Sequence, residues 1–151
     1  MKKTVLVLIS TFLFLTSLAF AGEENKILGL WDTPEKDCKI EIFMCGDKYC
    51  GRIAWLKDPL YSADDEGGLA GKPIVDRENP NPNLRSRPLM GLQLMEGFTY
   101  IGKNVWEKGT IYNPDNGKTY KCKMTLAASN RLEVRGYVGI PLLGATSIWT
   151  R

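Results

Sequence analysis

Apolar and polar side chains alternate with a period of two along most of this sequence. Between Lys118 and Ala127, apolar side chains occupy nearly every second position. Successive side chains of a β-strand point to opposite faces, so this period is typical of strands with one buried face. No stretch of 11 or more residues keeps the 3.6-residue period of an amphipathic helix. The sequence therefore predicts an all-β fold.

The same pattern predicts eight or nine antiparallel strands. A strong turn sequence with Asn116-Gly117 and a short turn at Ser129-Asn130 join three of them. Strands spaced in this way are typical of a sandwich or a closed up-and-down barrel. The predicted strands lie near 29–31 and at 39–45, 49–56, 89–94, 98–101, 105–112, 118–127, 132–138 and 145–150.

The first 21 residues have the pattern of a secretory signal peptide. Lys2-Lys3 forms a basic start, residues 5–18 are almost wholly apolar, and Ala19-Phe20-Ala21 has small residues where a signal peptidase reads them. We therefore expect residues 1–21 to be removed. Residues 22–151 should then form one domain in the periplasm or outside the cell.

Composition excludes several partners. The apolar run is shorter than the about 20 residues of a membrane span, and Gly22 is not the cysteine that a bacterial lipid anchor requires. The chain has 20 basic and 17 acidic residues, and loss of Lys2 and Lys3 leaves 18 against 17, a net charge of +1. We expect no membrane span, no lipid anchor and no nucleic-acid partner, because phosphate backbones attract strongly basic surfaces.

Four cysteines suggest disulfide bridges in an oxidising compartment. Cys45 and Cys50 flank residues 46–49 between two predicted strands, which favours their pairing and leaves Cys38 with Cys122. A zinc site is disfavoured, because the chain has no histidine and the cysteine spacings are not those of paired zinc ligands. We therefore expect two bridges and no metal.

The Cys45–Cys50 bridge also predicts the register of the first hairpin. If the two cysteines lie directly opposite each other, the apolar side chains of the two strands share one buried face. The predicted pairs on this face are Ile42 with Ile53 and Ile40 with Trp55.

Residues 57–88 differ in composition from the predicted strands. They contain five of the eight prolines and the acidic cluster Asp64-Asp65-Glu66. The cluster lacks the alternate ligand spacing of a hand-type calcium loop, so we interpret it as a solvated turn. A loop of this length in a compact domain is usually functional or mobile. We expect a lid or side arm.

The densest polar grouping lies at the end of this segment. Arg85 and Arg87 have planar guanidinium groups that can hold an anionic ligand on two parallel bonds. Alternatively, Asp76, Asn79 and the two arginines tie the segment to the barrel through ion pairs and bonds to free backbone groups. The two interpretations are compatible.

No constellation for covalent or acid–base catalysis is visible. Without histidine a Ser-His-Asp or Cys-His arrangement cannot exist, and no glycine-rich phosphate loop is present. Only Glu107 and Asp76 are candidates for shielded acids. We expect a protein that is not an enzyme and needs no cofactor.

Two binding functions remain beside the enzyme class. A carrier of a small apolar or amphipathic molecule requires a dry central pocket, and its predicted lining is Ile42, Ile53, Trp55, Tyr120 and Met124. A protein-interaction or inhibitor module requires a filled barrel with exposed side chains, for which Phe43, Trp106 and Tyr137 are the candidates. We favour the carrier, because a closed barrel offers a preformed apolar site.

Short motifs in a fixed order carry a family resemblance. They are Gly29-Leu30-Trp31, Cys45-Gly46, Cys50-Gly51-Arg52-Ile53, Asp76 with Asn79-Pro80, residues 84–92, Gly109 with residues 111–114, Asp115 with residues 117–120, Leu132 with residues 134–137, and Trp149-Thr150-Arg151. They resemble the exported bacterial family called domain of unknown function 2147. The resemblance covers essentially all of residues 22–151. It implies a small lipocalin-like or calycin barrel and no established activity.

The resemblance also implies a role for two residues at the ends of the barrel. In lipocalin-type barrels a Gly-x-Trp motif places its indole across the barrel floor, and an arginine from the last strand covers it. Trp31 and Arg151 resemble these partners. We expect a cation–π contact between them that closes the barrel, worth about 0.5 to 2 kcal/mol.

Overall fold

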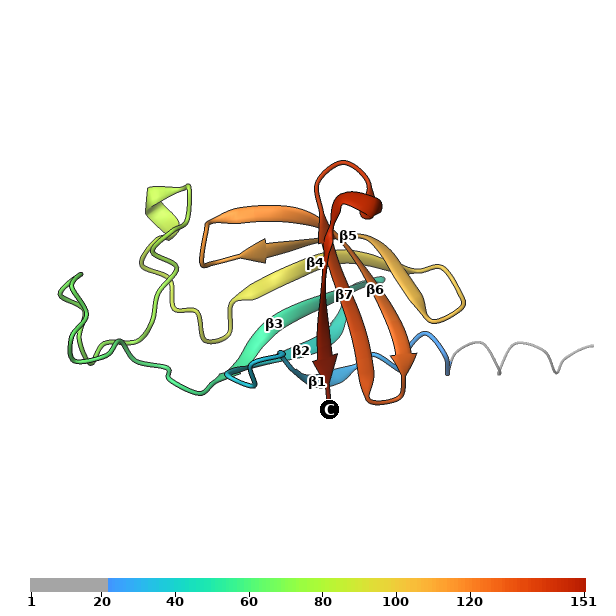
Figure 1. Cartoon of the computed structure of the whole chain (residues 1–151), viewed down its shortest axis with the longest axis horizontal. Coiled ribbons are helices and arrows are strands. Elements are labelled where there is room, and N and C mark those ends of the chain that lie inside the picture. Colours follow the sequence, from blue (N-terminus) through green and yellow to red (C-terminus); the bar gives the residue numbers. More distant parts are fainter. Residues whose placement is uncertain (1–21) are drawn as a thin grey trace, which may run out of the picture.

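The computed structural model describes residues 22–151, which form a closed barrel of eight antiparallel strands (Figure 1). Each strand pairs with the next along the chain, and β8 returns to pair with β1. The predicted closed antiparallel barrel is thus confirmed, and the predicted signal peptide lies outside the described residues. The strands are β1 (Gly29–Asp32), β2 (Cys38–Cys45), β3 (Lys48–Leu56), β4 (Gln93–Tyr100), β5 (Val105–Asn113), β6 (Lys118–Ala128), β7 (Arg131–Tyr137) and β8 (Ala145–Thr150).

In the described part of the chain, helical structure is confined to two single turns. They are the 3-10 helices η1 (Pro82–Leu84) and η2 (Pro141–Leu143), each of which begins with a proline. Within residues 22–151, no helix has the length and apolar character to span a membrane.

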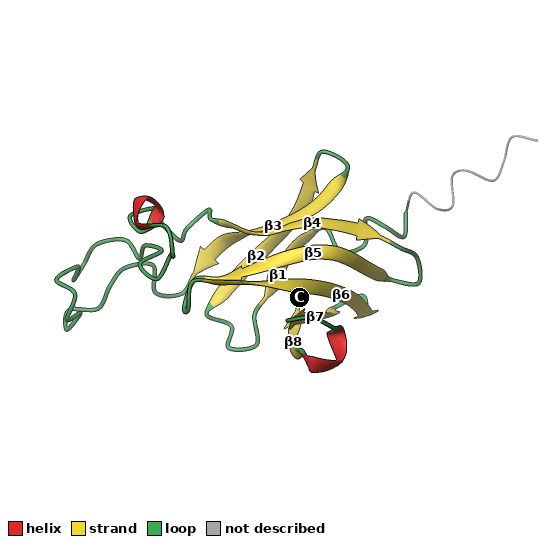
Figure 2. Cartoon of the chain, turned by 90° about the horizontal axis from the view of Figure 1, so that it is seen from above, coloured by secondary structure: helices red, strands yellow, loops and turns green. Residues whose placement is uncertain are grey.

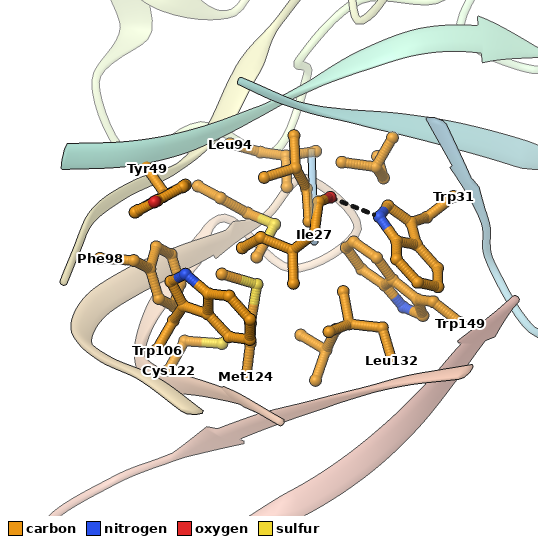
Figure 3. Close-up of a cluster of buried hydrophobic side chains, with 14 of the residues drawn as sticks. Ile27, Trp31, Tyr49, Leu94, Phe98, Trp106, Cys122, Met124, Leu132 and Trp149 are labelled. Carbon is orange, nitrogen blue, oxygen red and sulfur yellow. Dashed lines mark hydrogen bonds between the residues drawn. The ribbon is translucent and has the colours of Figure 1, made fainter. Parts of the chain in front are cut away.

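One end of the barrel is filled by large apolar side chains (Figure 3). Trp31, Phe98 and Trp106 are fully buried there. Ile27, which precedes β1, is buried with them, and its carbonyl accepts a 2.8 Å hydrogen bond from the Trp31 indole. The expectation that Trp106 is exposed was therefore wrong, because its ring packs against Tyr100 at 4.9 Å between centroids inside the barrel.

The β2–β3 hairpin has a different register from the predicted one. Cys45 lies opposite Lys48 across a two-residue turn, and Phe43 lies opposite Cys50. The Cys45–Cys50 disulfide is present, with Cα atoms 5.9 Å apart, but it joins the strands diagonally. A two-residue turn brings Gly46 into a left-handed conformation, with φ 70°. Ile40 consequently faces Ile53, and the predicted pairs Ile42–Ile53 and Ile40–Trp55 were wrong.

A β-bulge changes which side chain of β3 enters the barrel. The register shifts between Lys39 and Ile40, and beyond that point Leu56 pairs with Cys38 while Trp55 pairs with Lys39. A bulge inserts one residue and so reverses the inward and outward positions that follow. Trp55 therefore lies on the outer face, 40% exposed, with the Lys39 ammonium 5.9 Å from its ring.

The two short strands predicted at 89–94 and 98–101 are one strand, β4. Gly97 adopts a positive φ of 79° within it, which the chain accommodates without ending the strand. Residues 89–92 instead complete a turn at the base of the neighbouring arm.

We call residues 57–92 the arm, which extends from the barrel between β3 and β4 (Figures 1 and 2). Its base is closed by hydrogen bonds of Ile53 with Leu92 at 3.0 Å and with Gly91 at 2.8 Å. Near its tip Asp65 forms a 2.9 Å ion pair with Arg77. A backbone N–H from Leu69 is the main cause of the lowered pKa of Asp65, followed by Arg77. The acidic cluster is therefore part of an ordered turn.

Candidate functional site

A cavity of about 870 Å³ opens at the end of the barrel from which the arm extends (Figure 1). Some of its lining residues, among them Ile40, Ile53 and Trp149, also belong to the buried apolar cluster. The connections between β1 and β2, after β3 and between β5 and β6 border the cavity, and the arm begins beside it (Figure 1). Its walls are mainly apolar. The apolar lining side chains are Ile40, Ile53, Leu56, Ile74, Leu89, Leu94, Ile111, Tyr112, Tyr120, Val134, Ala145 and Trp149.

Two of the residues that line the cavity are small, Gly136 and Ala145. Gly136 of β7 pairs with Ala145 of β8 and with Cys122 of β6. A Cβ atom at Gly136 would lie 3.7 Å from the side chains of Ile111 and Tyr120, which is an ordinary van der Waals contact.

The predicted ligand-binding residues fall in different places. Ile53 and Tyr120 line the cavity. Ile42 and Met124 lie deeper, where they are almost completely buried in the core. Trp55 lies outside the barrel because of the bulge in the β2–β3 hairpin.

Sequence reasoning missed most of the cavity wall. Leu56, Leu94, Ile111, Val134 and Trp149 all occupy inward positions of strands. Alternation could have identified these positions as inward. It could not distinguish residues beside a cavity from residues in a filled core, because both are apolar and have the same period.

Cys38 and Cys122 are free thiols, so the predicted bridge between them is not formed. Cys38 lies at the start of β2 and lines the cavity, while Cys122 is completely buried in the middle of β6 beside Gly109 and Gly136. Burial raises the pKa of Cys38 to about 11, with a smaller contribution from Asp37, and burial raises the pKa of Cys122 to about 12. Both thiols are therefore protonated at neutral pH.

Asp76 lies at the centre of a buried polar cluster that joins the arm to β5. One carboxylate oxygen accepts a 2.6 Å bond from the Tyr112 hydroxyl, and the other accepts a 2.8 Å bond from Asn79. Arg87 donates to this second oxygen through two nitrogens, at 2.9 and 2.8 Å. The carboxylate is fully buried and fully bonded. Burial, followed by the bond to Asp76, raises the pKa of Tyr112.

Arg85 completes this cluster from the arm side. Its guanidinium donates a 2.7 Å bond to the carbonyl of Asn79. The structure thus brings Asp76, Asn79, Arg85 and Arg87 together. Neither arginine lines the cavity, and Arg87 borders a separate polar groove of about 340 Å³ beside Tyr112.

A glycine allows the arm to approach the barrel closely. Gly117, in the β5–β6 turn, has φ +67°, and a Cβ atom there would overlap the carbonyl oxygen of Glu78. The arm therefore lies directly on the turn that borders the cavity, and the Asp76 cluster keeps it there.

The other candidate residues from the sequence analysis lie outside the cavity. Arg151 lies 4.2 Å from the Trp31 ring at the filled end of the barrel. Phe43 and Tyr137 are half-buried, and the guanidinium of Arg52 lies 4.9 Å from the Phe43 ring. Glu107 forms a 3.7 Å ion pair with Lys123.

Residues 22–151 contain no group of three or more histidine, cysteine, aspartate or glutamate side chains arranged to hold a metal ion. The arrangement that the structure offers is an apolar cavity with a polar mouth, which can enclose a small molecule.

Comparisons with known proteins agree with this architecture. The family model of DUF2147, described as an uncharacterised protein conserved in bacteria, matches residues 29–151. The chain is similar to the solved structure of protein HP1028 from Helicobacter pylori, described as belonging to the lipocalin family. Identity is 25%, the TM-score is 0.68, and the match covers 83% of this chain and 82% of that one. No curated protein sequence matches this chain. The chain therefore belongs to the DUF2147 family, and its barrel is lipocalin-like.

Proposed function

We propose that this protein is an exported binding protein that encloses a small apolar or amphipathic molecule in its barrel. The observation that carries the proposal is the cavity of about 870 Å³ with mainly apolar walls. Ligand pockets usually have volumes of about 300 to 1,000 Å³ and a few polar groups among apolar ones. The cavity has this size and composition.

The cavity is built on a rigid frame. Its walls are strands of a closed barrel, and Ile111 and Tyr120 are directly paired on β5 and β6. In a preformed site few side chains and loops become ordered on binding. The entropy cost is therefore small, and more of the free energy of apolar contact remains as binding affinity. Removal of apolar ligand surface from water contributes about 25 cal/mol per Å².

Two observations support export as part of the proposal. Residues 1–21 have the sequence pattern of a cleaved signal peptide. The disulfide between Cys45 and Cys50 suits an oxidising compartment such as the periplasm or the cell exterior. We place the cleavage after Ala21, which leaves residues 22–151 as one domain.

The positions of the nominated acids favour binding over catalysis. Asp76 is surrounded by its own donors in the arm cluster, and Glu107 is paired with Lys123. Neither side chain lines the cavity. A ligand in the barrel would therefore meet neither acid.

One surface favours a protein-interaction module as the second candidate. The loop between β7 and β8 exposes Val138, Ile140, Leu142 and Leu143, with exposed fractions of 55 to 80%. Arg135 holds the loop through bonds to the carbonyls of Pro141 at 2.6 Å and Leu142 at 3.3 Å. Exposed apolar clusters often mark interaction surfaces.

Titration with neutral apolar probes tests the carrier proposal. Binding of 1-dodecanol should displace a fluorescent apolar dye and change the emission of Trp149, which lines the cavity. Ile111→Trp should fill the cavity and weaken binding by at least about tenfold. The matched control is Lys121→Trp, which adds the same ring on the exposed face of β6. If both variants bind like the wild type, or if no neutral probe binds, the carrier function is wrong.

A further inference from the structure

Four carboxylates surround the mouth of the cavity. Glu35 and Asp37 come from the connection between β1 and β2, Asp58 follows β3, and Asp115 lies in the β5–β6 turn. The β5–β6 turn and the end of β3 lie at the same end of the barrel, the end from which the arm extends (Figures 1 and 2). Three connections that are distant in the sequence thus contribute to one acidic rim, which we define as these four residues.

The rim has no basic counterpart in the cavity. No lysine or arginine of the described chain lines it, and Lys36 and Lys57 lie beside rim residues in sequence without reaching the wall. Within residues 22–151, none of the four carboxylates has an ion-pair partner within 4.0 Å. The whole chain has more basic than acidic residues, so composition does not account for an acidic mouth.

Four carboxylates without ion-pair partners give the mouth a negative potential. Asp37 accepts a 3.0 Å hydrogen bond from the Thr33 hydroxyl, which leaves its charge in place. Apolar walls have a low dielectric constant, and a cleft lined by one sign of charge concentrates the field and attracts ions of the opposite sign. The thiol of Cys38 lines the cavity beside Asp37 of the rim. Burial is the main cause of its raised pKa, and the charge of Asp37 raises the pKa further. Burial and the charge of Asp37 thus both disfavour the ionised form of the Cys38 thiol.

We propose that the cavity selects an amphiphile with an apolar body and a cationic head group. This inference rests on the proposed carrier function and specifies its ligand class. The apolar body contacts inward side chains such as Ile53, Ile111 and Val134. The cationic group lies at the acidic rim, where it remains partly hydrated. Fatty acids and other anionic amphiphiles are disfavoured, because their carboxylate would meet like charges.

The experiment compares three probes with the same twelve-carbon chain: dodecyltrimethylammonium, 1-dodecanol and dodecanoate. Affinities are measured on residues 22–151 by dye displacement, below the critical micelle concentration of each charged probe. The ammonium probe should bind at least about tenfold more tightly than dodecanoate, because the rim attracts a positive head group and repels a negative one. Raising the salt concentration should weaken the ammonium probe and leave dodecanol unchanged, because salt screens exposed charges.

Isosteric variants assign the preference to the rim. The rim variant changes Glu35→Gln, Asp37→Asn, Asp58→Asn and Asp115→Asn, which keeps shape and removes charge. The control variant changes four exposed acids that do not line the cavity: Asp47→Asn, Asp64→Asn, Glu66→Gln and Glu78→Gln. Both variants have the same net charge. Only the rim variant should lose the preference for the ammonium probe.

Protection of Cys38 from alkylation provides a second, local measurement. The bound ammonium probe should slow alkylation of this thiol, which lines the cavity. If dodecanol binds but dodecanoate binds as tightly as the ammonium probe, the charge preference is wrong and the carrier function stands. If the preference survives in the rim variant, the rim is not its source and the inference fails. If none of the three probes binds, both the inference and the carrier function are wrong.

Discussion

Arg151 covers the indole of Trp31 at 4.2 Å and joins the end of β8 to the beginning of the barrel. Its guanidinium also donates to the carbonyls of Lys26 at 2.7 Å, Leu28 at 3.1 Å and Ser129 at 3.0 Å. A single side chain thus connects the segment before β1 with the β6–β7 turn. β1 and β8 themselves share only the pair Asp32–Thr150, so side-chain contacts supply much of the closure at this seam.

Arg151→Ala should loosen this seam. We expect a loss of about 1 to 2 kcal/mol in the free energy of unfolding, because a cation–π contact and several hydrogen bonds disappear together. Amide hydrogen exchange should increase most in residues 24–32. Arg151→Lys keeps the charge but not the planar fork, and should recover only part of the stability. Uniform exchange in the variant would contradict this role.

Arg87→Ala should release the arm. It leaves the buried Asp76 carboxylate without its charged partner, which we expect to destabilise the protein by about 2 to 3 kcal/mol. Limited proteolysis should cut residues 57–92 faster, while the spectrum of the barrel strands is retained below the unfolding transition. Arg85→Ala removes one bond to the Asn79 carbonyl and should have a smaller effect in the same direction. Equal arm cleavage in wild type and Arg87→Ala would show that the cluster does not fix the arm.

Gly109→Ala should destabilise the filled end of the barrel. A Cβ atom at this position would overlap the ring of Phe98, which is fully buried. We expect a loss of about 1 to 3 kcal/mol in urea denaturation, as for other overpacked cores. Phe98→Leu costs stability alone but should reduce the effect of Gly109→Ala in the double variant. Additive effects in this double-mutant cycle would argue against the steric origin.

The structure predicts one disulfide and two free thiols. Peptide mapping without reduction should find Cys45 linked to Cys50, and two free thiols in the denatured protein. In the folded protein Cys38 should react before Cys122, because Cys38 is half-buried at the cavity and Cys122 is completely buried. A Cys38–Cys122 linkage would require a different packing of β2 against β6.

Cys122 should also give stability an alkaline dependence. A cysteine thiol has an ordinary pKa of 9.0, and burial raises that of Cys122 to about 12. The unfolded chain therefore loses this proton first as the pH rises above 9. The group's contribution to folding is complete below pH 9 and is lost towards pH 12, with a slope of at most about 1.4 kcal/mol per pH unit. Cys122→Ala should reduce the slope of the unfolding free energy between pH 9 and 10.5, whereas Met124→Leu, another buried change on β6, should not.

Alternation predicted the strands well because each strand has one face in the barrel. Residues 145–150 were predicted with both correct ends, and 118–127 lacks only Ala128. The errors occur where the period is interrupted. Gly97 and the bulge at Lys39 change the phase of alternation inside a strand, and a pattern with a fixed period cannot locate such a change.

The site was harder to predict than the fold. The sequence identified Ile53 and Tyr120 as inward, but depth along the barrel axis decides whether an inward residue meets a ligand or the core. Ile42 lies only two positions from Ile40 on β2, yet only Ile40 lines the cavity. The acidic rim was not predicted at all, because its members come from three connections that only the closed barrel brings together.

The arm leaves and re-enters the barrel at one place, the hydrogen bonds between Ile53 and residues 91–92. The arm is therefore a closed loop whose two ends are held together. The entropy cost of closing such a loop grows only with the logarithm of its length. Doubling its length costs only about 0.6 kcal/mol more. The barrel can therefore accept arms of very different lengths at this position, while the strand register on either side stays the same.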